Sequence, residues 1–217
     1  MGTVLHVCRV AELHPDAGAI GVTAIDKRAV AGAVRVGALG LRGDVQADRK
    51  HHGGPEKALY AFDQAEADHW AGELGEEVPP GRFGENLRVS GLAVDDAEIG
   101  ERWRIGEALE VEITGPRTPC ATFGRWLKQD GWVRRFAQHG RAGAYLRVLT
   151  PGPVAAGDDI TVLERPGHGV SVAGWFAANA PRDARALLAH EAQTGWEMAA
   201  YLRNHVDRAA LRQPAHG

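Results

Sequence analysis

Short apolar runs separated by glycine-containing turns dominate the chain up to residue 165. Residues 4–8, 100–106 and 109–113 place apolar side chains at alternate positions, while residues 58–62 and 144–149 form short apolar runs. Alternation with a period of two is typical of strands that bury one face. The 28 glycines suit the tight turns that many short strands require. We therefore predict a mainly β fold with some α, an antiparallel barrel or sandwich with peripheral helices.

Helical spacing interrupts this strand pattern at two places. Asp63 is placed to cap a helix that runs to Leu74, because a short acceptor side chain there can bond the first free N–H groups. Residues 122–138 carry apolar positions with helical spacing, and Gly131 is expected to break them into two helices.

The pattern changes at residues 165–169, after which apolar residues recur at helical spacing to the C-terminus. Three short amphipathic helices are predicted there, with apolar faces that include Val172, Leu187 and Leu202. We predict a β domain over residues 1–165 and a small three-helix appendage over residues 170–212. A segment of this length buries too little surface to be stable as a free-standing domain. The appendage is therefore expected to pack on the barrel or on a partner.

Charge and hydropathy narrow the class of protein. The chain has 217 residues and a net charge of −3, which argues against nucleic acid as a main partner because binding phosphates requires a basic face. No run approaches the ~20 apolar residues of a membrane helix, and the N-terminus lacks the pattern of a signal peptide. Two cysteines, Cys8 and Cys120, exclude a disulfide framework. A cytoplasmic protein is the expectation.

Cys120 is the strongest candidate for chemistry. It follows Arg117, Thr118 and a proline, so a stiff loop holds it beside a cation. Nearby positive charge favours the thiolate, which is a nucleophile, a carrier of persulfide sulfur or a ligand of soft metals. Burial as a small core residue is the alternative. Cys8 alternates within an apolar strand and is predicted to lie in the core.

A second candidate is the basic, glycine-containing segment of residues 40–57. Gly53 and Gly54 free backbone N–H groups to approach an anion, and Arg49 and Lys57 are placed to complete a phosphate site. His51 belongs to the same basic segment. An ordinary polar connection with a hairpin turn is the alternative.

A third candidate is the segment of residues 82–87. Phe83 and Leu87 are suited to anchor the loop in the core, which would leave Glu85 and Asn86 facing a ligand. The Asn86 amide offers both donors and acceptors, as the edge of a heterocycle requires. A simple turn is the alternative.

Taken together, these segments resemble the MOSC domain family, and within it the bacterial YiiM group. The stretches that carry the resemblance are residues 24–28, 40–44, 46–48, 52–54 with 57–58, 83–87, 116–120, 145–149 and 157–158. The resemblance implies a MOSC-type β-barrel followed by the small three-helix domain that often accompanies it in this group. It also implies a molybdenum cofactor (molybdenum bound to molybdopterin), with the Cys120 thiolate as a metal ligand.

The resemblance further implies a reductase of N-hydroxylated compounds such as 6-N-hydroxylaminopurine. The residues expected to bind the cofactor are Arg49, His51, Gly53, Gly54, Lys57, Asn86, Arg117 and Thr118. A persulfide carrier that transfers sulfur and a non-catalytic cofactor-binding module remain as alternatives. The chain has no flavin, nicotinamide or iron–sulfur motif, so a reductase would need a redox partner protein. The helical appendage is expected to cover the barrel or to form a homodimer contact.

Overall fold

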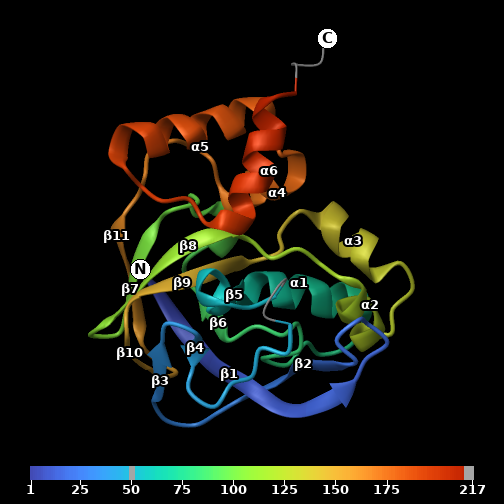
Figure 1. Ribbon diagram of the computed structural model, residues 1–217. Helices are drawn as coiled ribbons and strands as arrows, with labels where there is room; N and C mark the ends of the chain where they lie inside the picture. The colour runs from blue at the N-terminus through green and yellow to red at the C-terminus, as the bar shows by residue number, and fades with distance from the viewer. Residues whose placement is uncertain (49–51, 213–217) are drawn as a thin grey trace.

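The computed structural model describes residues 1–48 and 52–212, and the described strands close into a barrel (Figure 1). Its strands are β1 (Gly2–Pro15), β5 (Leu59–Asp63), β6 (Leu87–Ser90), β7 (Arg102–Ile105), β8 (Leu109–Pro116), β9 (Ala144–Thr150) and β11 (Asp159–Glu164). The order around the barrel is β11-β7-β8-β9-β5-β6-β1, and β1 pairs back to β11. Only β5 and β6 among these neighbours are parallel. The predicted barrel is confirmed.

Strand β1 pairs with three other strands, and this arrangement positions the candidate site described below. Its first half pairs with β6 and β11, while its second half pairs with β2 (Val22–Ala29). Register shifts lie along the β1 pairings with β2 and β6, and such irregularities bend a strand and increase its twist. The β1–β2 hairpin therefore runs out past the barrel towards the end of the molecule where α2 (Ala121–Leu127) lies (Figure 1).

A smaller sheet and three helices complete the first part of the chain. The sheet has the order β10 (Gly152–Val154), β3 (Val34–Gly37) and β4 (Gly40–Leu41). Helix α1 (Gln64–Leu74) begins where predicted, since the Asp63 carboxylate accepts from the Ala65 N–H at 3.0 Å. Helices α2 (Ala121–Leu127) and α3 (Trp132–His139) are separated at Gly131, whose φ of 63° is a left-handed conformation suited to glycine.

The chain ends in three helices, α4 (Val172–Ala178), α5 (Pro181–Thr194) and α6 (Ala200–Ala210), as predicted. They lie against one side of the barrel near β8 (Figure 1). Trp175 and Leu202 belong to the same buried apolar cluster as Trp103 of the barrel. The appendage thus shares the barrel's core. The division into domains 1–165 and 170–212 remains a prediction. Within the described residues, no helix has the length and hydropathy to cross a membrane.

Candidate functional site

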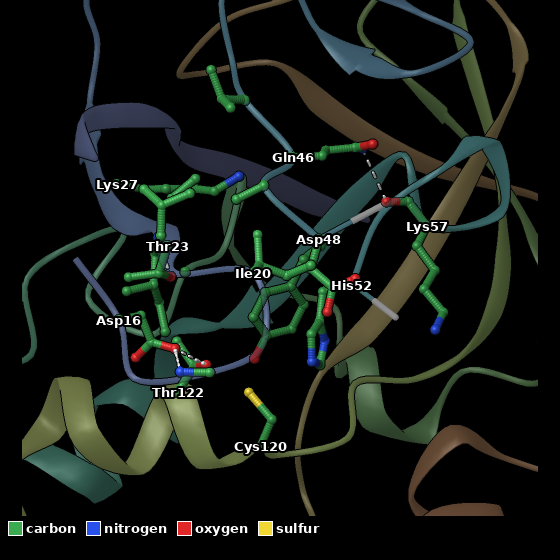
Figure 2. Close-up of a pocket in the computed structure, with 18 of the residues that line it drawn as sticks. Asp16, Ile20, Thr23, Lys27, Gln46, Asp48, His52, Lys57, Cys120 and Thr122 are labelled. Atoms are coloured by element: carbon green, nitrogen blue, oxygen red, sulfur yellow. Dashed lines mark hydrogen bonds between the residues drawn. The ribbon is translucent and has the colours of Figure 1, made fainter. Parts of the chain in front are cut away.

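A cavity of about 410 Å³ opens between the β1–β2 hairpin, the segment before β5 and the start of α2 (Figure 2). Segments that are distant in the sequence meet here because β5 and β9 are neighbours in the barrel and β8 delivers the chain to α2. A concave site with few polar groups among apolar walls is the usual form of a small-molecule site.

Cys120 lies at the base of this cavity. It is the residue immediately before α2, it has extended backbone angles, and its side chain is half-buried. Figure 2 shows its sulfur pointing into the cavity. Cys120 is therefore not a buried core residue, the alternative considered above. Cys8 is fully buried in the core, as predicted.

Arg117 brings a buried cation to the same cavity. The end of β8 positions it, only 4 % of it is exposed, and its guanidinium carbon lies 3.9 Å from the centroid of the Phe123 ring. Its Nη1 atom is buried and has no hydrogen-bond partner among the described residues. A buried unpaired donor carries a large desolvation cost, which a bound anion would relieve. Arg117 is therefore a strong candidate for an anion ligand.

Lys57 and His52 approach the cavity from the segment before β5. Lys57 ends the short helix η1 (Pro55–Lys57), and burial lowers the pKa of its ammonium group. The Nδ1 atom of His52 lies 3.2 Å from the Tyr145 hydroxyl. Burial, together with the charges of Arg117 and Lys57, lowers the pKa of His52 to about 4. His52 is thus a neutral imidazole at neutral pH, and Figure 2 shows its ring directed into the cavity.

The predicted glycine anion site is filled by the protein itself. The Gly54 N–H donates to Gln46 Oε1 at 2.8 Å. A Cβ atom on Gly53 would lie 2.8 Å from the same oxygen. Gly53 and Gly54 thus make room for Gln46, and neither lines the cavity. The Gly54 N–H is therefore engaged within the protein, and phosphate binding by the backbone of Gly53 and Gly54 stays a prediction. Arg49 and His51 lie outside the described residues.

Three other predicted positions do not present their side chains to a ligand. The Asn86 amide donates to Asp44 Oδ2 at 2.8 Å and accepts from the Tyr60 N–H at 3.2 Å. Asn86 lines the cavity, but its amide is already hydrogen-bonded to neighbouring segments of the protein and is not available to a ligand. Its neighbour Glu85 is fully buried against Arg88. Thr118 is exposed and lies outside the cavity lining.

The mouth of the cavity was not predicted from the sequence. Asp16 of the β1–β2 connection pairs with Arg125 of α2 at 2.6 Å and also accepts from the Thr122 hydroxyl at 3.0 Å. Ile20 and Val45 line the mouth and are 51 % and 41 % exposed. Apolar side chains at the opening and cations deeper inside suit a ligand with a flat apolar part and an anionic end. No pattern in the sequence marks Ile20 or Val45.

A family comparison fits this geometry. The MOSC domain family model matches residues 48–161, just over half of the chain, and that range includes His52, Lys57, Arg117 and Cys120. This chain belongs to the MOSC domain family. The predicted resemblance is thereby confirmed, and membership associates the chain with the molybdenum cofactor.

Curated relatives point in the same direction. YflK of Bacillus subtilis, described as uncharacterized, is 35 % identical over 150 residues, which cover 69 % of this chain and 67 % of that protein. YiiM of Escherichia coli is 34 % identical over 147 residues, covering 66 % and 65 %. A Gibberella moniliformis protein named Reductase is 33 % identical over 155 residues, covering 69 % of this chain but 28 % of that protein. The chain thus spans just under two thirds of YiiM and a much smaller share of Reductase.

Solved structures confirm the fold. YiiM from Geobacillus stearothermophilus superposes with a TM-score of 0.76 at 23 % identity, covering 96 % of this chain and 99 % of that one. YiiM from Escherichia coli gives a TM-score of 0.73 at 22 % identity, covering 96 % and 92 %. The match therefore extends over the barrel and the C-terminal helices together.

Proposed function

We propose that the cavity binds the molybdenum cofactor and that the protein is a reductase of N-hydroxylated compounds. One observation carries the proposal: Cys120 and Arg117 line the same cavity, and the buried Nη1 of Arg117 has no hydrogen-bond partner among the described residues. A thiolate is a ligand for a soft transition metal, and a guanidinium binds phosphate with two parallel hydrogen bonds. Family membership and the relative named Reductase support this assignment.

The residues present fit a cofactor that has a metal at one end and a phosphate at the other. Cys120 would supply its sulfur to molybdenum, while Arg117 and Lys57 would hold the anionic end. His52 stays neutral near these cations, so it is able to hydrogen-bond a ligand without adding charge. Asn86 and Gln46 would act indirectly, because they stabilise the segments that carry Lys57 and Tyr60.

Reduction of an N-hydroxylated amine consumes two electrons and two protons, breaks the N–O bond, and yields the amine and water. When bound, the molybdenum cofactor would supply the two-electron redox chemistry that this reduction requires. This chain's own residues would position the substrate at the mouth, where Ile20 and Val45 offer apolar surface to a flat base. The electrons would come from a separate redox partner protein, since no electron-carrier motif occurs in the sequence.

The test is to purify the protein from a host that makes the cofactor, and to measure molybdenum content and reduction of 6-N-hydroxylaminopurine with a chemical electron donor. The parent is expected to contain molybdenum and to reduce the base, and Cys120→Ser to lose both. Cys8→Ser is the matched control, because it removes a thiol that lies outside the cavity lining.

Other outcomes would contradict the proposal. Stoichiometric molybdenum in Cys120→Ser would remove the ligand assignment. Extra sulfur mass on Cys120 without molybdenum would favour sulfur transfer. Molybdenum without turnover would favour a cofactor-binding module.

A further inference from the structure

Helix α6 of the C-terminal appendage reaches the cavity region through Tyr201. The Nζ atom of Lys57 lies 4.0 Å from the centroid of the Tyr201 ring and 5.3 Å from that of Tyr145. An ammonium group over an aromatic face is attracted by the ring quadrupole, more strongly where water is partly excluded. The Lys57 side chain is thus held between a barrel residue and a residue of the appendage.

The Tyr201 ring is itself fixed against the barrel. The Tyr201 hydroxyl donates to Thr114 Oγ1 at 3.2 Å. The Thr114 hydroxyl in turn donates to the Glu56 carbonyl at 2.7 Å. Gly115 has a φ of 146°, and a Cβ atom there would lie 2.9 Å from the Tyr201 hydroxyl oxygen. A glycine in β8 therefore creates the space into which the tyrosine fits.

A second contact ties the start of α6 to the segment that carries Lys57. The Glu56 carboxylate accepts from the Ala200 N–H at 2.7 Å. A carboxylate at the beginning of a helix satisfies a free backbone donor and interacts favourably with the helix dipole. Adjacent residues of η1 thus bind α6 by two independent interactions, one through Glu56 and one through Lys57.

Lys57 also acts on the interior of the cavity. It lines the cavity with His52 and Arg117, and its charge contributes to the low pKa of His52. Partial burial of Lys57 disfavours its charged ammonium form. The aromatic ring of Tyr201 stabilises the ammonium, and so helps to keep Lys57 charged for binding an anion.

We propose that Tyr201 is a positioning residue for the anion subsite: it holds the Lys57 ammonium in place, and the C-terminal helices are thereby part of the binding site and not merely a cover. The inference rests on the proposed function only in taking the cavity as an anion site. It requires neither molybdenum nor turnover.

A double-mutant cycle on the full-length chain tests this inference, with inorganic phosphate as the probe. Phosphate affinity is measured by titration calorimetry for the parent, Tyr201→Leu, Lys57→Met and the double variant. We expect Tyr201→Leu to weaken binding by about 2- to 30-fold, the range for one cation–π contact. In the Lys57→Met background the same substitution should have no further effect. Tyr201→Phe, which keeps the ring, should stay within about twofold of the parent.

A spectroscopic measurement separates positioning from a general loss of structure. The ε-methylene signals of Lys57 should show the upfield ring-current shift of a nearby aromatic face. This shift should persist in Tyr201→Phe and become much smaller in Tyr201→Leu, where only the more distant Tyr145 ring remains. If the leucine variant does not fold, Tyr201→Met takes its place in the cycle.

Three results would overturn the inference. The parent does not bind phosphate, or Tyr201→Leu leaves the phosphate affinity unchanged, or Tyr201→Leu lowers the affinity in the Lys57→Met background as much as in the parent. Failure of the proposed function is distinguishable, because it appears as absent molybdenum or absent turnover while the phosphate cycle still gives its expected pattern.

Discussion

The guanidinium group of Arg117 lies over the Phe123 ring, with its carbon 3.9 Å from the ring centroid. The ring covers one face of the guanidinium and excludes water from it, while Nη1 remains without a partner among the described residues. This contact joins the end of β8 to α2, the two elements that flank Cys120. It therefore holds the cation and the thiol in one fixed arrangement.

We predict that Arg117→Lys weakens phosphate binding by about tenfold or more, because lysine cannot reproduce the planar donor pair or the stacking on Phe123. Titration calorimetry with inorganic phosphate measures the change. Arg182→Lys, in α5 with a side chain 87 % exposed, is the matched control and should bind phosphate like the parent. Equal affinity in Arg117→Lys would remove Arg117 from the site.

The two cysteines should differ in reactivity towards a thiol-alkylating reagent. Cys120 is half-buried in the cavity, whereas Cys8 is fully buried, and desolvation raises the pKa of Cys8 to about 12. Only the thiolate reacts appreciably, so intact-mass analysis of the native protein should show one adduct and Cys120→Ser should show none. Both thiols should react after denaturation. Modification of native Cys8 ahead of Cys120 would contradict the structure.

The buried ion pair of Glu85 and Arg88 is predicted to be essential for stability. Both side chains are fully buried, and Glu85 also accepts from the N–H groups of Gly81 and Phe83 at 2.7 and 3.0 Å. Glu85→Gln leaves the Arg88 charge uncompensated, which typically costs about 3–5 kcal/mol of unfolding free energy. Urea unfolding measures this loss.

An exposed acid of the same region supplies the control for that pair. Glu77→Gln changes an exposed side chain and should leave the free energy of unfolding within about 0.5 kcal/mol of the parent. A loss of less than about 1 kcal/mol in Glu85→Gln would show that Arg88 finds another partner.

His168 should make stability depend on pH near the junction with the C-terminal helices. Its Nε2 donates to the Ile99 carbonyl at 2.8 Å, and its Nδ1 accepts from the Val170 N–H at 3.0 Å. Burial lowers the pKa of His168 below its ordinary 6.5, even though Glu98 acts in the opposite direction. The unfolded chain therefore binds the proton first, and the folded state loses stability as pH falls below about 6.5.

Urea unfolding at about pH 7.5 and about pH 5.5 tests this dependence. His168→Gln has no titrating group and should lose less stability between the two values than the parent. His205→Gln, at an exposed position of α6, should keep the parent's dependence. The same slope in His168→Gln as in the parent would rule out His168 as the source.

Local signals in the sequence were sufficient for most of the elements. Alternating apolar positions and short apolar runs identified the barrel strands other than β6. Asp63 marked the start of α1 and Gly131 the break before α3, because caps and turns depend on residues close in sequence. Among the site residues, Cys120, Arg117 and Lys57 were recognisable from their own chemistry.

The partners of those residues were not recognisable. Gln46 takes the Gly54 N–H that was expected to bind a phosphate, and Asp44 takes the Asn86 amide. His52 meets Tyr145, and Lys57 meets Tyr201, from segments far apart along the chain. Such pairs form only when the barrel closes, so no periodicity or spacing reports them.

The sequence alone determined the strand and helix periods, the family resemblance and the residue types available for metal and anion binding, because these depend on local chemistry and order. Only the tertiary structure decided which polar groups are consumed within the protein and which are left for a ligand. A buried donor normally finds its partner in three dimensions, and within residues 1–48 and 52–212 the fold provides none for Arg117 Nη1.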